Sequence, residues 1–288
     1  MRHLKSFHVF HISANSSSYS EAAEKLNITH GAVSKQIKVL ESYLDQTLFV
    51  KKGRNVCLTK EGELLKSYTQ QAFQALDIGV SKLRQQQQNS IEVSCEPTLT
   101  MRWLMPRLAT FNETFKADVR LSTAGGPIRL ASSGLSMAIR RDDFAIDEEF
   151  HRTPLVEEWV GPVMSPQYWQ QVKQDINAIK LLHSETRPKA WRLWSKATSQ
   201  ESLLNNEQQS FAHFYFALQA SVDGLGATMG SYPLVVDDLQ RGNLIAPFGF
   251  IQSGHHYVAL TEADNSGELE SSFIQWLTSE LKDCVPKF

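Results

Sequence analysis

One short polar run separates two stretches of the chain whose hydrophobic patterns fold in different ways. Residues 85–90 (QQQQNS) contain no apolar side chain. Before this run, apolar residues recur almost entirely at helical intervals. Directly after it, residues 91–95 (IEVSC) alternate apolar and polar side chains, as a half-buried strand does. The 288 residues are enough for about two domains, so the run marks a boundary between a helical part and a part that begins with a strand.

Charge is divided unequally between these two parts. Residues 1–90 carry 12 basic and 7 acidic residues, whereas residues 91–288 carry 17 and 24, so the net charges are +5 and −7. The net charge of the whole chain, −2, hides this difference. A basic part joined to an acidic one favours a polyanion such as nucleic acid as the partner of the basic part.

The helical part contains two consecutive helices joined by a short turn. After a helix over residues 3–14, Ser18 and Glu21 form a capping box that opens a helix ending at Leu26, and Thr29 can cap the next. One face of this last helix is apolar (Val33, Ile37, Leu40, Leu44), and the opposite face is polar or cationic (His30, Ser34, Lys35, Lys38). This arrangement is typical of a helix-turn-helix, whose second helix enters the major groove of DNA.

A hairpin and a long helix follow. Strands over residues 48–50 and 56–58 flank the segment KKGRN (51–55), where turn-forming residues accompany three cations, so we predict a wing that contacts phosphates.

Thr59 can cap a helix over residues 60–85. We expect its apolar stripe to pair with a second copy of the chain, antiparallel, because nothing else in the sequence covers it. The stripe consists of Leu64, Leu65, Tyr68, Ala72, Phe73, Leu76, Val80 and Leu83.

Residues 7–65 resemble the amino-terminal domain of LysR-type transcriptional regulators. The matching elements are Ser18, residues 22–26 (AAEKL), 29–37 (THGAVSKQI), 40–41 (LE), Leu44, 48–49 (LF) and 58–62 (LTKEG). Residues 102–108 (RWLMPRL), 137–140 (MAIR), 231–235 (SYPLV), Leu239 and Gly242 extend the resemblance to nearly the whole chain. They are similar to the subgroup that includes regulators of glycine cleavage and of inducible β-lactamase. Two positions depart from the family: Ser136 replaces a usual acidic residue, and Asp45 replaces a usual glycine.

The resemblance implies an α/β protein with an N-terminal all-α winged helix-turn-helix (1–59), a linker helix for dimerisation (60–90) and a periplasmic-binding-protein-like effector domain (91–288). The lobes of that domain would be residues 91–160 with 264–288, and 161–263, with crossings near Val160–Gly161 and Glu262–Asp264. We expect double-stranded DNA to be contacted by Ser18, Thr29, His30, Gly31, Ser34, Lys35, Lys38, Lys51, Lys52 and Arg54.

Ligands of α/β lobes bind beyond the carboxyl ends of strands, near helix N-termini. Residues that qualify are Thr98, Leu99 and Thr100 after the first strand, Arg140 with Arg141 after the strand over 137–139, and Ser165 at a later helix start. By resemblance, His213, Phe214 and His256 face the same cleft. Donors outnumber acceptors in this set, and Ser136 removes a further negative charge. We therefore expect a small anionic effector, such as an amino acid, another carboxylate or a cell-wall fragment.

Simpler roles for some of these residues stay open. Thr98 could only cap a helix, and Arg140 could pair with Asp142 or Asp143. Adjacent His255 and His256 would point to opposite faces of a strand and so would not chelate a metal. With three cysteines and no CxxC pair, we expect neither metal nor cofactor.

Two other function classes compete with a ligand-responsive regulator. An α/β enzyme is disfavoured because P-loop, HExxH, GxSxG and paired-carboxylate motifs are missing, and a DNA-binding architectural protein is disfavoured by the large α/β body. No run approaches a membrane span and the first residues, MRHLKSFHVF, do not form a signal peptide, so we expect a cytoplasmic protein. The apolar stripe of the long helix leads us to expect a homodimer or homotetramer.

Overall fold

The computed structural model describes residues 3–52, 55–128, 130, 134–262 and 267–287. The chain separates into two compact units, Met1–Leu83 and Arg84–Phe288. We call the first unit the head and the second the body. The division falls within the long helix α4 (Lys60–Gln88), just before the polar run of residues 85–90.

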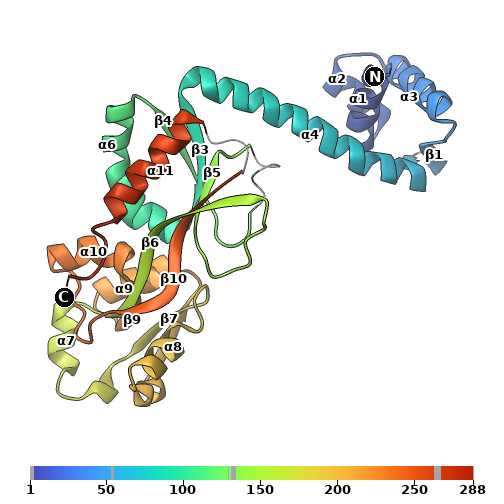
Figure 1. Ribbon diagram of the computed structural model, residues 1–288. Coiled ribbons are helices and arrows are strands. Elements are labelled where there is room, and N and C mark those ends of the chain that lie inside the picture. Colours follow the sequence, from blue (N-terminus) through green and yellow to red (C-terminus); the bar gives the residue numbers. More distant parts are fainter. Residues whose placement is uncertain (1–2, 53–54, 129, 131–133, 263–266, 288) are drawn as a thin grey trace. The chain divides into compact units, whose positions relative to one another are not determined.

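The head is the predicted winged helix-turn-helix (Figure 1). Its elements are α1 (Leu4–Ala14), α2 (Tyr19–Leu26), α3 (His30–Leu44), β1 (Phe49–Lys52), β2 (Asn55–Leu58) and the start of α4 (Lys60–Gln88). The apolar faces of α1 and α3 close over a small core that contains Phe10, Val33, Ile37, Leu40 and Leu48. Burial of these side chains supplies most of the free energy that holds the short helices together.

Local capping determines where the helices of the head begin and end. The Ser18 hydroxyl accepts the Glu21 amide at 3.2 Å, and the Thr29 hydroxyl accepts the Ala32 amide at 3.2 Å, as predicted. Helix α3 ends at Asp45, which has the left-handed conformation (φ 52°) that the usual glycine would adopt without strain. At Gly62 the first turn of α4 passes so close to the hairpin that a Cβ would lie 2.3 Å from the Leu48 carbonyl oxygen.

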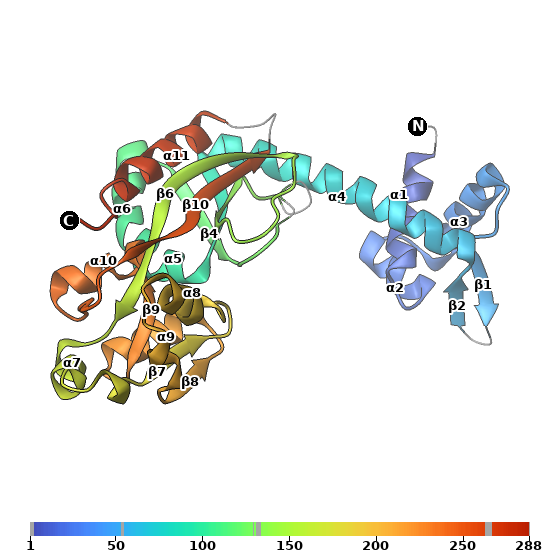
Figure 2. The ribbon, with the colours of Figure 1, turned by 60° about the horizontal axis from the view of Figure 1, so that its bottom comes forward.

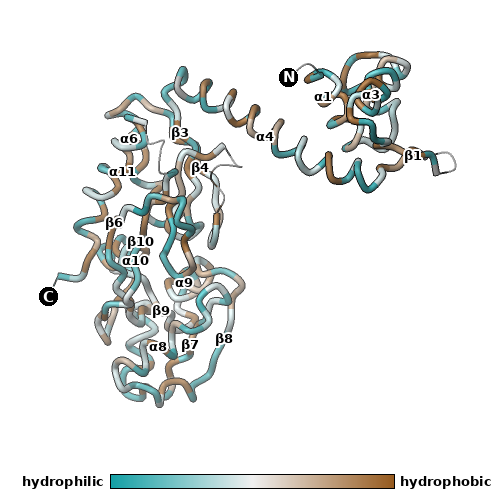
Figure 3. The backbone as a smooth tube through the Cα atoms, turned by 45° about the vertical axis from the view of Figure 1, so that its right-hand side comes forward, coloured by the Kyte–Doolittle hydropathy of each residue, from teal (hydrophilic) through white to brown (hydrophobic). Residues whose placement is uncertain are grey.

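The apolar stripe of α4 divides between two roles. Leu65 packs against the head core, and the Phe73 ring lies 5.1 Å and 5.0 Å from the rings of His8 and His11 in α1. The remaining large apolar side chains are exposed, and they form bands along the helix (Figure 3). These are Leu64, Tyr68, Leu76, Val80 and Leu83.

A mixed sheet of eight strands runs through the body (Figure 2), in the order β4-β3-β5-β10-β6-β9-β7-β8. The strands are β3 (Ser90–Cys95), β4 (Asp118–Thr123), β5 (Met137–Arg141), β6 (Phe150–Val163), β7 (Leu181–Ser184), β8 (Gln208–Phe211), β9 (Ala227–Ser231) and β10 (Ile251–Glu262). Strands β3, β4 and β5 are parallel at one end, and β7, β8 and β9 are parallel at the other. Between them, β10 runs antiparallel to β5 and β6.

The two long central strands join the halves of the sheet. Strand β6 pairs with β10 as far as Val160 and then with β9 over Val160–Val163. Strand β10 pairs with β5 over Tyr257–Leu260, so these residues belong with the first half. The expected second crossing, Glu262–Asp264, lies at the end of β10, and Asp264 itself lies outside the described residues.

Helices cover both halves of the sheet. Those packed on the first half are α5 (Pro97–Leu99), the π-helical turn η1 (Thr100–Leu104), α6 (Met105–Phe115) and α11 (Glu268–Leu281). Those of the second half are α7 (Pro166–Val172), η2 (Ile176–Ala178), α8 (Ala190–Ala197), η3 (Glu201–Asn205), α9 (Phe214–Val222) and α10 (Tyr232–Arg241). Phe111, Phe273 and Trp276 form an aromatic cluster between α6 and α11, and Trp191 and Trp194 anchor a second core.

Pro106 lies in the first turn of α6. Helix α6 begins only at Met105, so the missing N–H of the proline costs no hydrogen bond. The turn before it is π-helical. The short helix α5 (Pro97–Leu99) continues directly into this turn, and Glu96 precedes α5 as its N-cap at the end of β3.

Candidate DNA interface and ligand cavity

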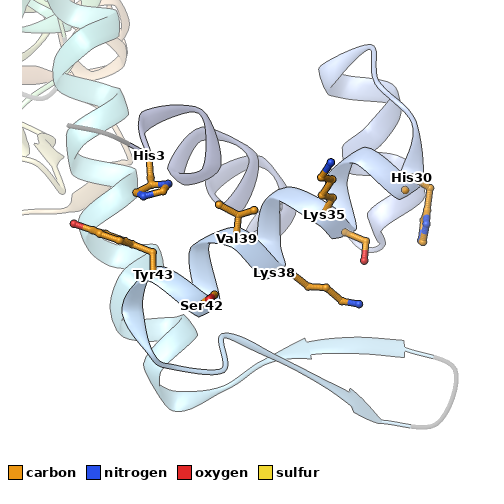
Figure 4. Close-up of a pocket in the computed structure, with 9 residues that line it drawn as sticks. His3, His30, Lys35, Lys38, Val39, Ser42 and Tyr43 are labelled. Carbon is orange, nitrogen blue, oxygen red and sulfur yellow. The ribbon is translucent and has the colours of Figure 1, made fainter.

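The outward face of α3 is a shallow groove of about 780 Å³ (Figure 4). It brings together five of the residues expected to contact DNA: His30, Gly31, Ser34, Lys35 and Lys38. The remaining lining residues, His3, Val39, Ser42 and Tyr43, were missed because the ring of His3 reaches Tyr43 (4.4 Å) only in the folded head.

Gly31 leaves room for an approaching partner. A Cβ built at this position would meet nothing within 4 Å, so the packing of the head does not require glycine there. What the missing side chain provides is an open backbone on an exposed helix, beside Ser34 and Lys35. An edge of a base pair could therefore come close to the start of α3.

The groove is cationic because the only acidic residue within α3 that could oppose it is used elsewhere. Lys35 and Lys38 are exposed and point outward from the helix (Figure 4). The Glu41 carboxylate accepts the backbone amides of Leu48 (2.8 Å) and Phe49 (3.3 Å), so it fixes the entry to the hairpin. Two exposed lysines on one face suit a phosphate backbone.

Ser18 and Thr29 have capping roles in addition to any contact with DNA. Each hydroxyl oxygen accepts an amide from the first turn of its helix, which leaves the hydroxyl hydrogen free to donate to a phosphate. In the wing, Lys51 is exposed on β1 and Lys52 ends that strand. Arg54 lies outside the described residues.

The body contains a cavity of about 490 Å³ at the carboxyl ends of β3, β4, β5, β7 and β8. This is the edge at which α/β folds bind ligands. Thr98, Arg140, His213 and Phe214 of the expected effector residues line it, together with Arg141, which was expected to accompany Arg140. The other lining residues are Glu96, Pro97, Gly125, Gly126, Asp143, Thr186, Arg187 and Tyr215.

Four expected effector residues do not line this cavity. Leu99 is buried in the core of the first half, and the Thr100 hydroxyl donates to the Glu96 carbonyl at 2.9 Å. Ser165 caps α7 by accepting the Tyr168 amide at 3.3 Å. The backbone amide of His256 donates to Asp142 at 2.8 Å, so His256 contacts the loop that follows β5 and does not line the cavity.

Ser136 and the two adjacent histidines also differ from expectation. The Ser136 hydroxyl accepts the Glu92 amide at 3.2 Å and does not line the cavity, so it cannot tune the charge there directly. His255 and His256 both approach Asp142, at 3.3 Å and 3.9 Å, because the register of β10 shifts just before them. Across the described ranges, no group of three His, Cys, Asp or Glu side chains is placed to hold a metal ion.

Arg140 is a buried cation without a carboxylate partner. Its side chain is 1% exposed, and it donates to the carbonyls of Ser94, Ile139 and Gly126 and to the Ser94 hydroxyl. Its expected alternatives, Asp142 and Asp143, pair with Arg152 and Arg141 instead. Among the residues that the structure describes, no carboxylate lies within 4 Å of Arg140, and burial lowers the pKa of its guanidinium.

An ionic network that the sequence did not reveal lies beside Arg140. Glu158 is fully buried and accepts from Arg187 and from Arg141, each at 2.7 Å. Arg187 also donates to Glu96 at 3.1 Å and to the Tyr257 hydroxyl at 3.0 Å, and it lies 4.2 Å over the Phe214 ring. Pairs such as Glu96 and Arg187 are 91 residues apart, so no local pattern could have found them.

Comparison with known protein families assigns both parts of the chain. Residues 4–63 match the family described as "Bacterial regulatory helix-turn-helix protein, lysR family", and residues 84–282 match the "LysR substrate binding domain". Within the described residues, no helix is long and apolar enough to cross a membrane.

Curated relatives match over nearly the full length. The chain is 33% identical to the HTH-type transcriptional regulator TrpI of Pseudomonas aeruginosa, covering 96% of this chain and 97% of that one. It is 29% identical to the glycine cleavage system transcriptional activator of Escherichia coli strain K12, covering 99% and 96%.

Solved structures show the same fold. The effector binding domain of AmpR from Citrobacter freundii is 21% identical, with a TM-score of 0.57, and covers 68% of this chain and 99% of that one. CrgA from Neisseria meningitidis is 22% identical, with a TM-score of 0.55, and covers 97% and 99%. The predicted fold class is therefore confirmed for the body and for the complete chain.

Proposed function

Because this chain belongs to the LysR family of bacterial transcriptional regulators, we propose that α3 binds a specific operator and that a small effector in the body cavity controls this binding. The observation that carries the proposal is the groove on α3. It gathers two lysines, a histidine, a serine and an open glycine on one exposed face. His30 and Ser34 can hydrogen-bond to base edges, and Lys35 and Lys38 can reach bases or phosphates.

The wing adds affinity without adding sequence information. Lys51, Lys52 and Arg54 would contact phosphates on either side of the major groove. Two copies joined through the exposed stripe of α4 would present two heads to a two-part operator, as dimers of this kind do. The relatives are regulators, and we propose that this chain likewise acts on DNA in the cytoplasm and catalyses no reaction.

The cavity offers an anchor for a negatively charged group. Arg140 lines it, and no carboxylate of the described residues lies within 4 Å of its guanidinium, although the charge of Glu96 acts on it from farther away. The Thr98 hydroxyl lines it too and forms no hydrogen bond within the described part of the chain, so it can serve as a second donor. Two donors converging on one anionic group are a common way to bind a carboxylate. The effector would shift the arrangement of the body, and α4, the covalent connection to the head, would transmit the change.

Replacing Ser34 or Lys35 by alanine tests the DNA interface. Each variant should lose about 1–3 kcal/mol of specific binding free energy, because a contact to a base or phosphate disappears while the core face of α3 is untouched. Fluorescence anisotropy with the operator measures this loss, and circular dichroism checks the fold. Lys173→Ala, which removes an exposed lysine from the body, is the matched control. Unchanged affinity in both α3 variants would show that another surface binds DNA.

Thr98→Val tests the cavity. Valine keeps the shape of the buried threonine and removes only its hydroxyl, so operator binding should persist while the transcriptional response to the effector is lost. A reporter fused to the operator region, compared under inducing and non-inducing growth, measures this response. Thr114→Val is the control, since Thr114 is exposed on α6. If Thr98→Val and Arg140→Ala both respond as the wild type does, the effector does not bind in this cavity.

A further inference from the structure

The cavity presents the guanidinium of Arg140, which no carboxylate of the described residues contacts directly, and one unsatisfied carboxylate oxygen, Oε2 of Glu96. We infer that its ligand is a zwitterion of amino-acid size, whose carboxylate binds Arg140 and Thr98 and whose ammonium binds Glu96. This inference rests on the proposed function, in which the cavity holds the effector, and it narrows the chemical class of that effector.

Arg140 and Thr98 provide the half of the site that binds an anion. The four hydrogen bonds of Arg140 use all but one of the N–H donors that a guanidinium carries. All four acceptors are neutral, so the bonds hold the guanidinium in place without cancelling its charge. Thr98 is 2% exposed and adds a hydroxyl donor. A carboxylate would supply the missing negative charge and accept both donors.

Glu96 provides the half that binds a cation. Its Oε1 accepts from Arg187 at 3.1 Å, but its Oε2 is buried and has no hydrogen-bond partner in the described structure. A buried carboxylate oxygen without a donor is unfavourable, and buried polar atoms of this kind are rare in folded proteins. An ammonium group carries three N–H donors and the opposite charge, so it would satisfy Oε2.

The charges of the lining favour a ligand that carries both signs. Arg141 pairs with Asp143 and Glu158, and Arg187 pairs with Glu158 and with Oε1 of Glu96, at 2.6–3.1 Å. Oε2 of Glu96 has no partner in the described structure, and Arg140 contacts no carboxylate there, so these two groups of the lining can each bind a charged group of a ligand. A simple anion would neutralise Arg140 but be repelled by Glu96, and a simple cation would meet the reverse problem. Only a ligand with both charges satisfies both groups.

The rest of the cavity suits a modest side chain. Its volume of about 490 Å³ lies within the range of small-molecule sites. Phe214 and Tyr215 supply apolar surface, and the Tyr215 ring stacks on His213 at 5.4 Å. Gly125 and Gly126 also line the cavity and have nothing within 4 Å of a Cβ position, so this part of the wall, beside Arg140, has no side chains of its own.

Isothermal titration calorimetry on the full-length protein tests the inference. The probes are the twenty common L-amino acids, D-alanine and D-serine. Each one that binds is compared with the 2-hydroxy acid and the amide that have the same side chain. We expect at least one amino acid to bind, and both analogues to bind at least about tenfold more weakly, because each lacks one of the two charges.

The variant Glu96→Gln isolates the ammonium contact. Glutamine keeps an acceptor for Arg187 and removes the charge, so affinity for the amino acid should fall at least about tenfold while affinity for the hydroxy acid is kept. The preference of the wild type for the amino acid should therefore disappear. Glu207→Gln is the matched control, since Glu207 pairs with Lys180 at 2.8 Å on the surface and does not line the cavity. If Glu96→Gln fails to fold, the comparison of amino acid with hydroxy acid on the wild type decides.

Two results would overturn the inference. If carboxylates without an ammonium bind as tightly as amino acids, the ligand is a simple anion, and the proposed role of the cavity stands without its zwitterion specificity. If no amino acid of the panel binds, the inference is wrong as well. The reporter response of Thr98→Val then shows separately whether the cavity holds any effector.

Discussion

Replacing Glu158 by alanine should lower the thermal midpoint of unfolding of the body by about 10 °C. Glu158 is fully buried and holds Arg141 and Arg187, whose side chains are only 16% and 11% exposed. Removing one member of such a network leaves buried charges without a partner, which costs about 3–5 kcal/mol. For a domain of about 200 residues, each kcal/mol lowers the midpoint by about 2–4 °C. Differential scanning calorimetry measures the shift.

The adjacent residue provides the control. Glu157 is partly exposed on the same strand, and its carboxylate accepts only from Gln252, at 2.9 Å. Glu157→Ala should therefore change the midpoint little, as surface substitutions usually do. Equal shifts in the two variants would mean that the network adds no stability beyond an ordinary surface contact.

The same network predicts how stability depends on pH. Burial would raise the pKa of Glu158, but Arg187 and Arg141 outweigh it and lower the pKa from 4.5 to about 2. Stabilisation by this carboxylate is therefore complete above pH 4.5 and is lost as the pH falls towards 2. The wild type should lose stability more steeply than Glu158→Ala across this window, and parallel curves would contradict the assignment.

The head could be predicted in detail because its structure is specified locally. The caps at Ser18, Thr29 and Thr59 act within three residues of the helix starts that they fix. The apolar spacing of α3 identified its buried face, and therefore its exposed one, without knowledge of any distant contact. Both predictions required only the periodicity of one helix.

The body was predictable only in outline, because contacts between distant segments decide its details. Short strands were found from their composition, but the length of β6, Phe150–Val163, depends on its pairing with β10 over Phe150–Val160. The place of Tyr257–Leu260 beside β5 also depends on a pairing more than 100 residues apart. The alternation of apolar and polar residues in one strand does not identify the strand that pairs with it.

The cavity shows the same limit at the level of single residues. Thr98, Arg140, His213 and Phe214 were found because they follow strand ends or match a family pattern. Glu96 also follows a strand, but its importance comes from an unsatisfied oxygen and a partner at Arg187, which only the folded structure shows. The acceptors Glu96 and Asp143 line the cavity as well, beside three arginines, and neither was among the expected effector residues.

Introducing a charge at Leu76 should abolish the dimer and with it binding to an operator of two half-sites. Leu76 is 58% exposed in the middle of the apolar stripe of α4, between Tyr68 and Leu83, which are exposed to 63% and 64%. An antiparallel partner helix would bury these side chains, and an aspartate at Leu76 would be buried there without a counterion, at a cost of several kcal/mol. A single head would then contact one half-site and lose the avidity that the second head provides.

Sedimentation of Leu76→Asp measures this loss, and Gln70→Asp is the matched control. Gln70 is exposed on the opposite side of the same helix, so the control adds the same charge outside the stripe and should remain dimeric. Leu76 contributes nothing to the head core, so the variant should keep the helical circular dichroism of the wild type. A stable dimer of Leu76→Asp would show that the exposed stripe of α4 is not the interface and that another surface must cover those apolar side chains.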